Sequence, residues 1–258
     1  MSNSATSLKI NDDNIEYEER LVAYIDILGW KEIINRSIVD AELRKNMKFS
    51  FDMLHNRGFE FLGDYKQKEI YPGDYFVEIS QVSDSLIVSR SALHPPYYFT
   101  IELCMIQTML LGKGFLLRGG LTIGKMYHRG NIAFGPALTR AYYLETTDAI
   151  YPRIVIDPVF VDLFRSEDKI VEDYDAESTK ISEDGLGFIN FLKFGIEIQH
   201  QNHPDFKRMQ RIRDVIEEGL GTTKGSANVY QKYLWLANYY NSMIEDHPRT
   251  VLSAVRIK

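Results

Sequence analysis

The sequence predicts an α+β fold, because apolar stretches of strand length alternate with longer stretches whose apolar residues repeat at helical spacing. Two of the strand-like stretches, 21–30 and 82–89, each carry one carboxylate, Asp26 and Asp84 respectively. A strong turn signal at 72–74 precedes the second stretch. Residues 75–79 begin an alternating pattern that leads into the second stretch, and a short polar break separates the two, so we expect a β-hairpin with Asp84 near its tip.

Length and composition limit the classes of protein that need to be considered. The chain has 258 residues, 45% hydrophobic and 26% charged, which is ordinary for a soluble globular protein. We expect a flexible N-terminal tail over 1–18 and a single domain over 19–258 with a helical C-terminal extension. A net charge of −6 argues against nucleic-acid binding. No membrane span and no export signal are recognisable, so we expect a cytoplasmic protein whose lone Cys104 is a small buried hydrophobe.

The remaining elements follow in chain order. Apolar spacing predicts one or two helices over 30–57 and a further helix over 97–111. The strand expected over 115–124 contains Gly119 and Gly120, and paired glycines inside a strand indicate the close approach of another backbone or a ligand. The later elements are expected to be a helix over 137–144, a strand over 153–157, an acidic surface excursion over 166–184, a strand over 188–194 and helices over 207–220 and 227–244.

The two carboxylates are the first candidate site. Taken singly, an aspartate at a strand end is more often a turn or capping residue than a metal ligand. Together, Asp26 and Asp84 at adjacent strand ends would repel each other unless a cation lay between them. The pair therefore predicts a divalent-cation site.

Four blocks, in this order, carry a resemblance to a known family. They are Tyr-Ile-Asp-Ile-Leu-Gly-Trp at 24–30, Ser-Asp-Ser at 83–85, Leu-Arg-Gly-Gly-Leu-Thr-Ile-Gly at 117–124 and Phe-Gly-Pro-Ala-Leu-Thr-Arg-Ala-Tyr-Tyr-Leu-Glu at 134–145. In sequence and order they resemble the motifs of class III nucleotidyl cyclase domains. The resemblance implies a ferredoxin-like βαββαβ core with a mostly antiparallel sheet flanked by helices.

The resemblance also implies a two-metal site. Asp26 and Asp84 would bind two divalent cations, Mg²⁺ or Mn²⁺, and the backbone carbonyl of Ile27 would complete one coordination shell. The cations would lower the pKa of a ribose 3′-hydroxyl, which attacks the α-phosphorus and expels pyrophosphate. Backbone N–H groups for the phosphates would come from the turn at Leu28, Gly29 and Trp30.

This chain departs from the family pattern where the transition-state donors are expected. The family helix carries an Asn and an Arg, and this chain has Thr139 and Tyr143 in their places. Arg140 lies close to the same helix face as Tyr143 and could reach the phosphate instead. Arg118 is the other candidate, unless it serves an ion pair between strands. Lys232 could contact the γ-phosphate, although a solvated lysine is the simpler interpretation.

Two further positions concern the base. The resemblance aligns the purine-reading residues of these enzymes with Ser80 and Ile132, and neither purine-reading pair is present. The chain is therefore similar to the pyrimidine cyclases of the Pycsar antiphage system, which make cyclic UMP or cyclic CMP that a separate effector protein reads. This implies UTP or CTP as the substrate, and we favour UTP.

Class III domains form twofold dimers with each active site at the interface. The resemblance thus implies a homodimer in which Asp26 and Asp84 face Thr139 and Arg140 of the partner subunit. Two other functions stay open. One is a non-catalytic cyclase-like module that binds a nucleotide or a protein, and the other is a diguanylate cyclase, against which the lack of a Gly-Gly-Asp-Glu-Phe turn argues.

Overall fold

The computed structural model describes residues 15–55, 77–161, 178–192, 206–246 and 256–257. Three of the sequence predictions therefore lie wholly or largely outside the described residues. These are the N-terminal tail, the turn at 72–74 and most of the acidic excursion. Among the described residues, no helix combines the length and the apolar character that crossing a membrane requires.

The core of the fold is a four-stranded antiparallel unit in the order β2-β3-β1-β4. Among the described residues, two helices lie between β1 and β2 and one helix lies between β3 and β4, which is the βαββαβ arrangement. The predicted α+β class with a mostly antiparallel sheet is confirmed. These elements are β1 (Glu18–Ile27), α1 (Trp30–Ser37), α2 (Ala41–His55), β2 (Glu78–Val82), β3 (Ser85–Ser91), α4 (Pro96–Leu111) and β4 (Leu117–Arg129).

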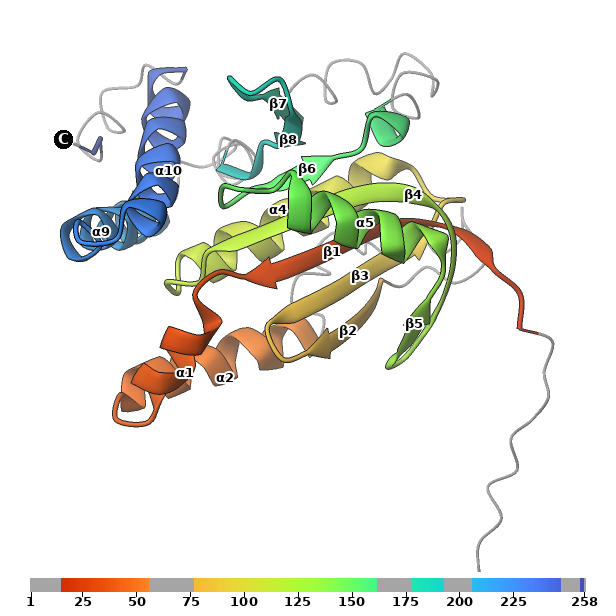
Figure 1. Ribbon diagram of the computed structural model, residues 1–258, viewed down its shortest axis with the longest axis horizontal. Helices are drawn as coiled ribbons and strands as arrows, with labels where there is room; N and C mark the ends of the chain where they lie inside the picture. Colours follow the sequence, from red (N-terminus) through yellow and green to blue (C-terminus); the bar gives the residue numbers. More distant parts are fainter. Residues whose placement is uncertain (1–14, 56–76, 162–177, 193–205, 247–255, 258) are drawn as a thin grey trace, which may run out of the picture.

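The sheet continues beyond β4 and is flanked by further helices (Figure 1). A short strand β6 runs parallel to β4, and β8 and β7 extend this edge with antiparallel pairing. β5 folds back on the end of β4. These elements are β5 (Ile132–Phe134), α5 (Pro136–Thr147), β6 (Ile154–Ile156), β7 (Thr179–Ile181), β8 (Gly187–Ile189), α9 (Phe206–Thr222) and α10 (Ala227–Glu245).

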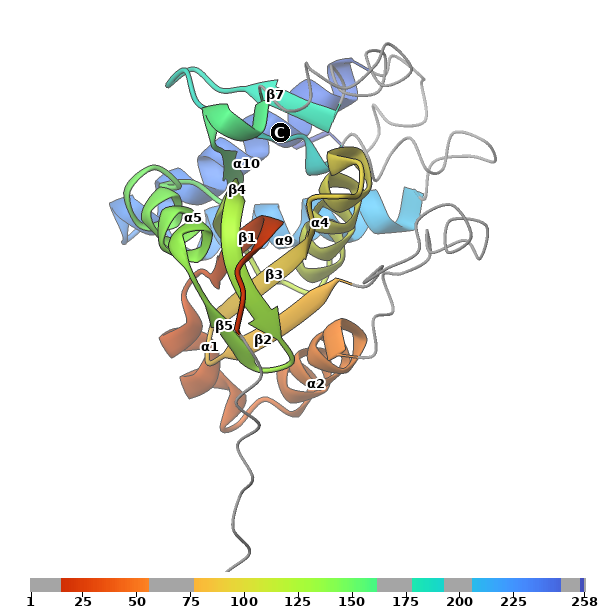
Figure 2. The ribbon, with the colours of Figure 1, turned by 90° about the vertical axis from the view of Figure 1, so that its right-hand side faces the viewer.

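The alternation of side chains along β1 separates two faces of the sheet. Leu21, Ala23 and Ile25 belong to the main hydrophobic core, which includes residues of α4. Val22 and its neighbours on the opposite face pack with α5 in a second, smaller cluster. Figure 2 shows α4 and α5 on opposite sides of the strands. Because side chains alternate with period 2, Asp26 shares the α5 face with Val22.

The paired glycines of β4 are required by close backbone contacts. A Cβ atom on Gly120 would lie 2.4 Å from the carbonyl oxygen of Ala141 and 2.5 Å from Cβ of Leu144, both on α5. A Cβ atom on Gly119 would lie 2.6 Å from the carbonyl oxygen of Tyr24 on β1. The predicted close approach is confirmed, and the approaching group is backbone on both sides. It allows α5 to lie directly on β4 beside the end of β1.

Several element boundaries differ from the sequence-based expectation. β1 begins at Glu18, so this residue belongs to the sheet and not to the tail. β4 runs on to Arg129, since its last residues pair with β1 and β5. The strand expected over 188–194 is the short β8, which ends at Ile189. Pairing partners distant in sequence decide these ends. The helices α4, α9 and α10 lie within two residues of their predicted bounds, and Cys104 is buried as expected.

Candidate functional site

A hollow of about 640 Å³ lies where β1 ends and α1 begins. It is formed by the end of β1, the first residues of α1, the β2–β3 turn, the start of β4 and one side chain of α10. Its lining residues are Asp26, Ile27, Leu28, Gly29, Trp30, Lys31, Glu32, Asn35, Asp84, Arg118 and Lys232. The hollow thus contains every residue predicted to bind metal.

The β2–β3 hairpin brings Asp84 beside Asp26. Ser83 and Asp84 form the two-residue turn between the strands, and Ser83 adopts a positive φ of 61°. Asp26 lies opposite Ser85 in the ladder between β1 and β3. The N–H of Ile27 donates to the carbonyl oxygen of Asp84 over 3.0 Å. The expected hairpin with Asp84 at its tip is confirmed.

The electrostatics of Asp26 reflect this proximity. Burial raises the pKa of Asp26 above its usual value, and the negative charge of Asp84 raises the pKa further. The guanidinium of Arg118 acts in the opposite direction and lowers the pKa of Asp26. A partly buried carboxyl group facing a second carboxyl group favours either a proton or a cation between them.

The donor set fits a divalent cation that is shared with a substrate. Among the described residues, no group of three or more His, Cys, Asp or Glu side chains could hold a metal ion. The lining of the hollow offers the neighbouring carboxylates of Asp26 and Asp84, the carboxylate of Glu32 on α1 and nearby backbone carbonyls. Mg²⁺ is commonly bound by one or two carboxylates together with substrate phosphates and water, so Asp26 and Asp84 fit that kind of site.

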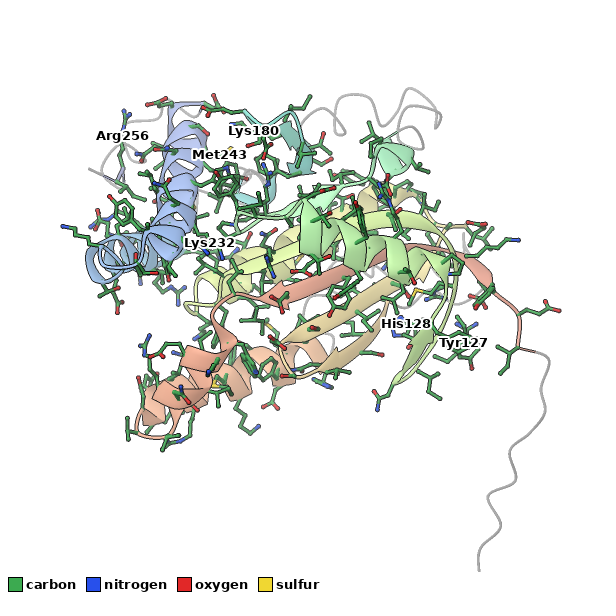
Figure 3. All side chains as sticks on the ribbon, in the orientation of Figure 1. Tyr127, His128, Lys180, Lys232, Met243 and Arg256 are labelled. Carbon is green, nitrogen blue, oxygen red and sulfur yellow. The ribbon has the colours of Figure 1, made fainter. Side chains whose placement is uncertain are left out.

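The cationic residues in the lining of the hollow are Lys31 at the start of α1, Arg118 on β4 and Lys232 on α10. Arg118 lies directly opposite Asp26 in the β1–β4 ladder, and its Nη2 atom is 3.5 Å from Oδ2 of Asp26. The ion pair between strands that the sequence left open for Arg118 is therefore present. Lys232 on α10 is partly buried, and Figure 3 shows it on the side of α10 that faces the sheet. Burial and the charge of Arg118 lower the pKa of Lys232, so it is not the solvated lysine expected from sequence.

Glu145, for which no role was predicted from the sequence, lies on α5 beside Arg118 and outside the lining of the hollow. Nε of Arg118 lies 2.7 Å from Oε1 of Glu145 in an ion pair, and the Glu145 side chain is only 3% exposed. Glu145 is the last residue of the motif block at 134–145, but the sequence did not indicate that it pairs with Arg118. The contact of α5 with Gly120 brings it within reach of Arg118.

The turn after β1 is only partly available to phosphate. Gly29 adopts a left-handed φ of 75° and precedes α1, whose N-terminal end therefore lies at the hollow. The N–H groups of Trp30 and Lys31 belong to the first turn and have no intrahelical acceptor. The N–H of Leu28 donates to the carbonyl oxygen of Leu116 over 2.8 Å, so the phosphate contact expected from this group is wrong.

The other predicted site residues lie outside the hollow of their own chain. Ser80 is buried, with Oγ donating to the carbonyl oxygen of Gly130 over 2.7 Å and lying 2.8 Å from Nε2 of His128. Its hydroxyl therefore faces the protein interior and not a base. Ile132 on β5 is 60% exposed. Thr139 and Arg140 lie on α5, and Nε of Arg140 donates to Oδ2 of Asp157 over 2.6 Å. None of these four residues lines the hollow.

The contact between Ser80 and His128 leads to a prediction about pH. Burial lowers the pKa of His128 to about 4, and the charges of Arg20 and Arg129 contribute. A histidine with a depressed pKa binds fewer protons in the folded than in the unfolded state between about pH 4 and 6.5, so stability falls as pH falls through this range. We expect a loss of about 2 kcal/mol between pH 7 and 4.5 from this residue.

Urea unfolding at both pH values measures the effect. The variant His128→Gln should be less stable at pH 7, but it should lose about 2 kcal/mol less than the wild type on acidification. Equal losses in the two proteins would show that His128 is protonated without cost to the fold.

Comparisons with known proteins give distant structural matches. No protein-family model matches the sequence, and no curated protein does. The adenylyl cyclase CyaB from P. aeruginosa is 13% identical, with 67% of this chain and 94% of that chain covered at a TM-score of 0.43. The guanylate cyclase domain of RhGC from Catenaria anguillulae, in complex with GTP, is 14% identical over 68% and 96% of the two chains, at 0.41.

A third match is a class III adenylyl cyclase-like ATP-binding protein from Pseudomonas aeruginosa. It is 10% identical, with 82% of this chain and 47% of that chain covered, at a TM-score of 0.40. All three likenesses are distant.

Proposed function

We propose that this protein is a nucleotidyl cyclase of the class III type that converts UTP, or CTP, to the 3′,5′-cyclic monophosphate and pyrophosphate. The observation that carries the proposal is the pair Asp26 and Asp84, held side by side at the end of β1 in an open hollow with Arg118 and Lys232. Acidic and cationic residues around one space suit a triphosphate and its cations.

The reaction would form a bond between the ribose 3′-oxygen and the α-phosphorus and break the α–β phosphoanhydride bond, while the hydroxyl proton leaves to water. Two divalent cations held by Asp26, Asp84 and the Ile27 carbonyl would make the hydroxyl more acidic and offset phosphate charge. Arg118 would contact the phosphates from β4 and Lys232 from α10. The backbone of Gly29 and Trp30, at the N-terminus of α1, would donate to phosphate oxygens.

The active site would be completed by a second copy of the chain. Thr139 and Arg140 of the partner subunit would then stabilise the charge that develops on the α-phosphate. In support, Arg140 is partly exposed although it pairs with Asp157, so its guanidinium is held on the surface of α5 in a fixed position. A monomer would bind cations but would not turn over.

The choice of base rests on the lack of purine-reading groups at Ser80 and Ile132. Because Ser80 is bonded to His128 and Gly130, it offers no donor or acceptor to a purine edge. We keep the pyrimidine assignment on this basis, with UTP favoured. The cyclic product would be a cytoplasmic second messenger in antiphage defence, read by a separate effector protein.

The test is product formation from each of the four nucleoside triphosphates in the presence of Mn²⁺. We expect pyrophosphate release with UTP or CTP, and a cyclic pyrimidine mononucleotide as the product in mass spectrometry. A cyclic purine nucleotide would overturn the base assignment. A cyclic dinucleotide would point instead to a diguanylate cyclase type of reaction.

A non-catalytic nucleotide-binding module is the second candidate, and one contact favours it. Arg118 lies 3.5 Å from Asp26 and partly neutralises a carboxylate that catalysis would need. If the protein binds Mn²⁺ and nucleotide but releases no pyrophosphate with any triphosphate, this second function is the correct one.

Arg140→Ala should reduce turnover by two or more orders of magnitude if the proposed transition-state role is correct, since removing one oxyanion donor costs about 10²–10³ in rate. The matched control is Arg256→Ala, which removes an exposed arginine paired with Glu245 on the far end of α10. Turnover is measured at saturating nucleotide. Full activity of Arg140→Ala would transfer the role to Arg118.

A further inference from the structure

Arg118 stands between two carboxylates that compete for it. One is Asp26, 3.5 Å from Nη2, and the other is Glu145, 2.7 Å from Nε. The shorter contact is with Glu145, which lies on α5 outside the lining of the hollow. Arg118 itself is 27% exposed, so the rest of its guanidinium is accessible from the hollow.

The environment of Glu145 favours a fixed ion pair. Its side chain is almost completely buried, and a buried carboxylate that loses its cation is strongly destabilised. The helix that carries it cannot shift away easily, because its backbone lies against Gly120 of the neighbouring strand. Glu145 therefore holds Arg118 from a rigid position.

We propose that Glu145 is a positioning residue that limits the pairing of the Arg118 guanidinium with Asp26. Asp26 then stays available to a divalent cation, and the outer face of Arg118 stays available to phosphate. Without the Glu145 charge, Arg118 would pair fully with Asp26, because this carboxylate is its neighbour across the β1–β4 ladder. This inference rests on the proposed function, since it assigns Asp26 to cation binding.

The test measures Mn²⁺ binding to the full chain without nucleotide, by titration with detection of free Mn²⁺ in electron paramagnetic resonance. We expect Glu145→Gln to weaken Mn²⁺ binding at least about tenfold, because Arg118 then neutralises Asp26. In the background of Arg118→Gln, the same Glu145→Gln change should alter binding less than about threefold, because no guanidinium is left to move.

Each outcome has a distinct meaning. Equal weakening in both backgrounds would show that the Glu145 charge acts on the cation directly, and it would overturn the positioning role. Unchanged binding in Glu145→Gln would overturn it as well. If the wild type itself binds no Mn²⁺, or if Asp84→Asn binds it equally well, the proposed function fails first and the two failures are distinguishable.

Glu102→Gln is the matched control for loss of a buried carboxylate. Glu102 on α4 forms a buried pair with Arg90 away from the hollow. We expect it to lose stability comparably and to keep wild-type Mn²⁺ binding. If Glu145→Gln does not fold, Arg118→Gln is compared with the double variant. The positioning role requires the Mn²⁺ affinities of these two proteins to differ by less than about threefold.

Discussion

Asp84→Asn is expected to abolish turnover while the protein stays folded. The substitution removes one of two facing carboxylates. A divalent cation then loses a charged ligand, and the triphosphate loses the cation that would offset its charge. The fold should not suffer, because Asp84 lies in an exposed hairpin turn and its backbone bond to Ile27 does not depend on the side chain. Asp26→Asn should behave in the same way.

Thermal melting with and without Mn²⁺ separates the metal role from a structural one. A ligand at 100 times its dissociation constant stabilises a protein by about 2.7 kcal/mol, so Mn²⁺ should raise the wild-type melting temperature and leave both Asn variants unchanged. In the absence of metal, Asp26→Asn should be at least as stable as the wild type at neutral pH. The raised pKa of Asp26 means that its charged form opposes folding above that pKa.

The control for these variants is Asp52→Asn on α2, which removes an exposed aspartate paired with Lys48. It should retain both turnover and the response to Mn²⁺. Retained activity in Asp26→Asn or Asp84→Asn, with unchanged melting, would remove the metal assignment.

Gly120→Ala is expected to cost about 3 kcal/mol of unfolding free energy, at the upper end of overpacking effects. The new Cβ would lie 2.4 Å from the Ala141 carbonyl oxygen and 2.5 Å from Cβ of Leu144. The Ala141 oxygen is part of the α5 backbone and the Leu144 Cβ is attached directly to it. Neither atom can rotate away, so α5 has to move as a whole. That displacement would also carry Glu145 away from Arg118.

Urea unfolding of Gly120→Ala and Gly187→Ala side by side provides the measurement. An added Cβ on Gly187 in β8 meets nothing within 4 Å, so this variant reports the effect of the exchange itself. If the two variants lose equal stability, α5 does not depend on the missing side chain of Gly120.

The sequence predicted most of the fold and the centre of the site because their signals are local. The alternation along β1 and the hairpin around Asp84 are set by period-2 patterning and turn chemistry. Gly119 and Gly120 indicated a close approach before its partner was known. That Asp26 and Asp84 lie close together depends on the pairing of β1 with β3, and this proximity was implied by the family resemblance.

The rest depends on contacts between residues far apart in the chain. The pair formed by Arg118 and Glu145 exists only once α5 lies on β4. Ser80 points to His128, 48 residues later, which no local pattern indicates. The Leu28 N–H is taken by Leu116, because β4 continues beside the end of β1. The family resemblance indicated where these residues lie in the motifs, but it did not indicate which residues they contact.

One backbone hydrogen bond described above bears on how such a site could be controlled. The hydrogen bond from the Ile27 N–H to the Asp84 carbonyl oxygen joins the main chains of the two acid-bearing segments. Moving the acids apart would therefore require β1 to separate from β3 at this end. Control of the proposed activity would therefore act on the binding of the nucleotide, of its cations or of the second subunit.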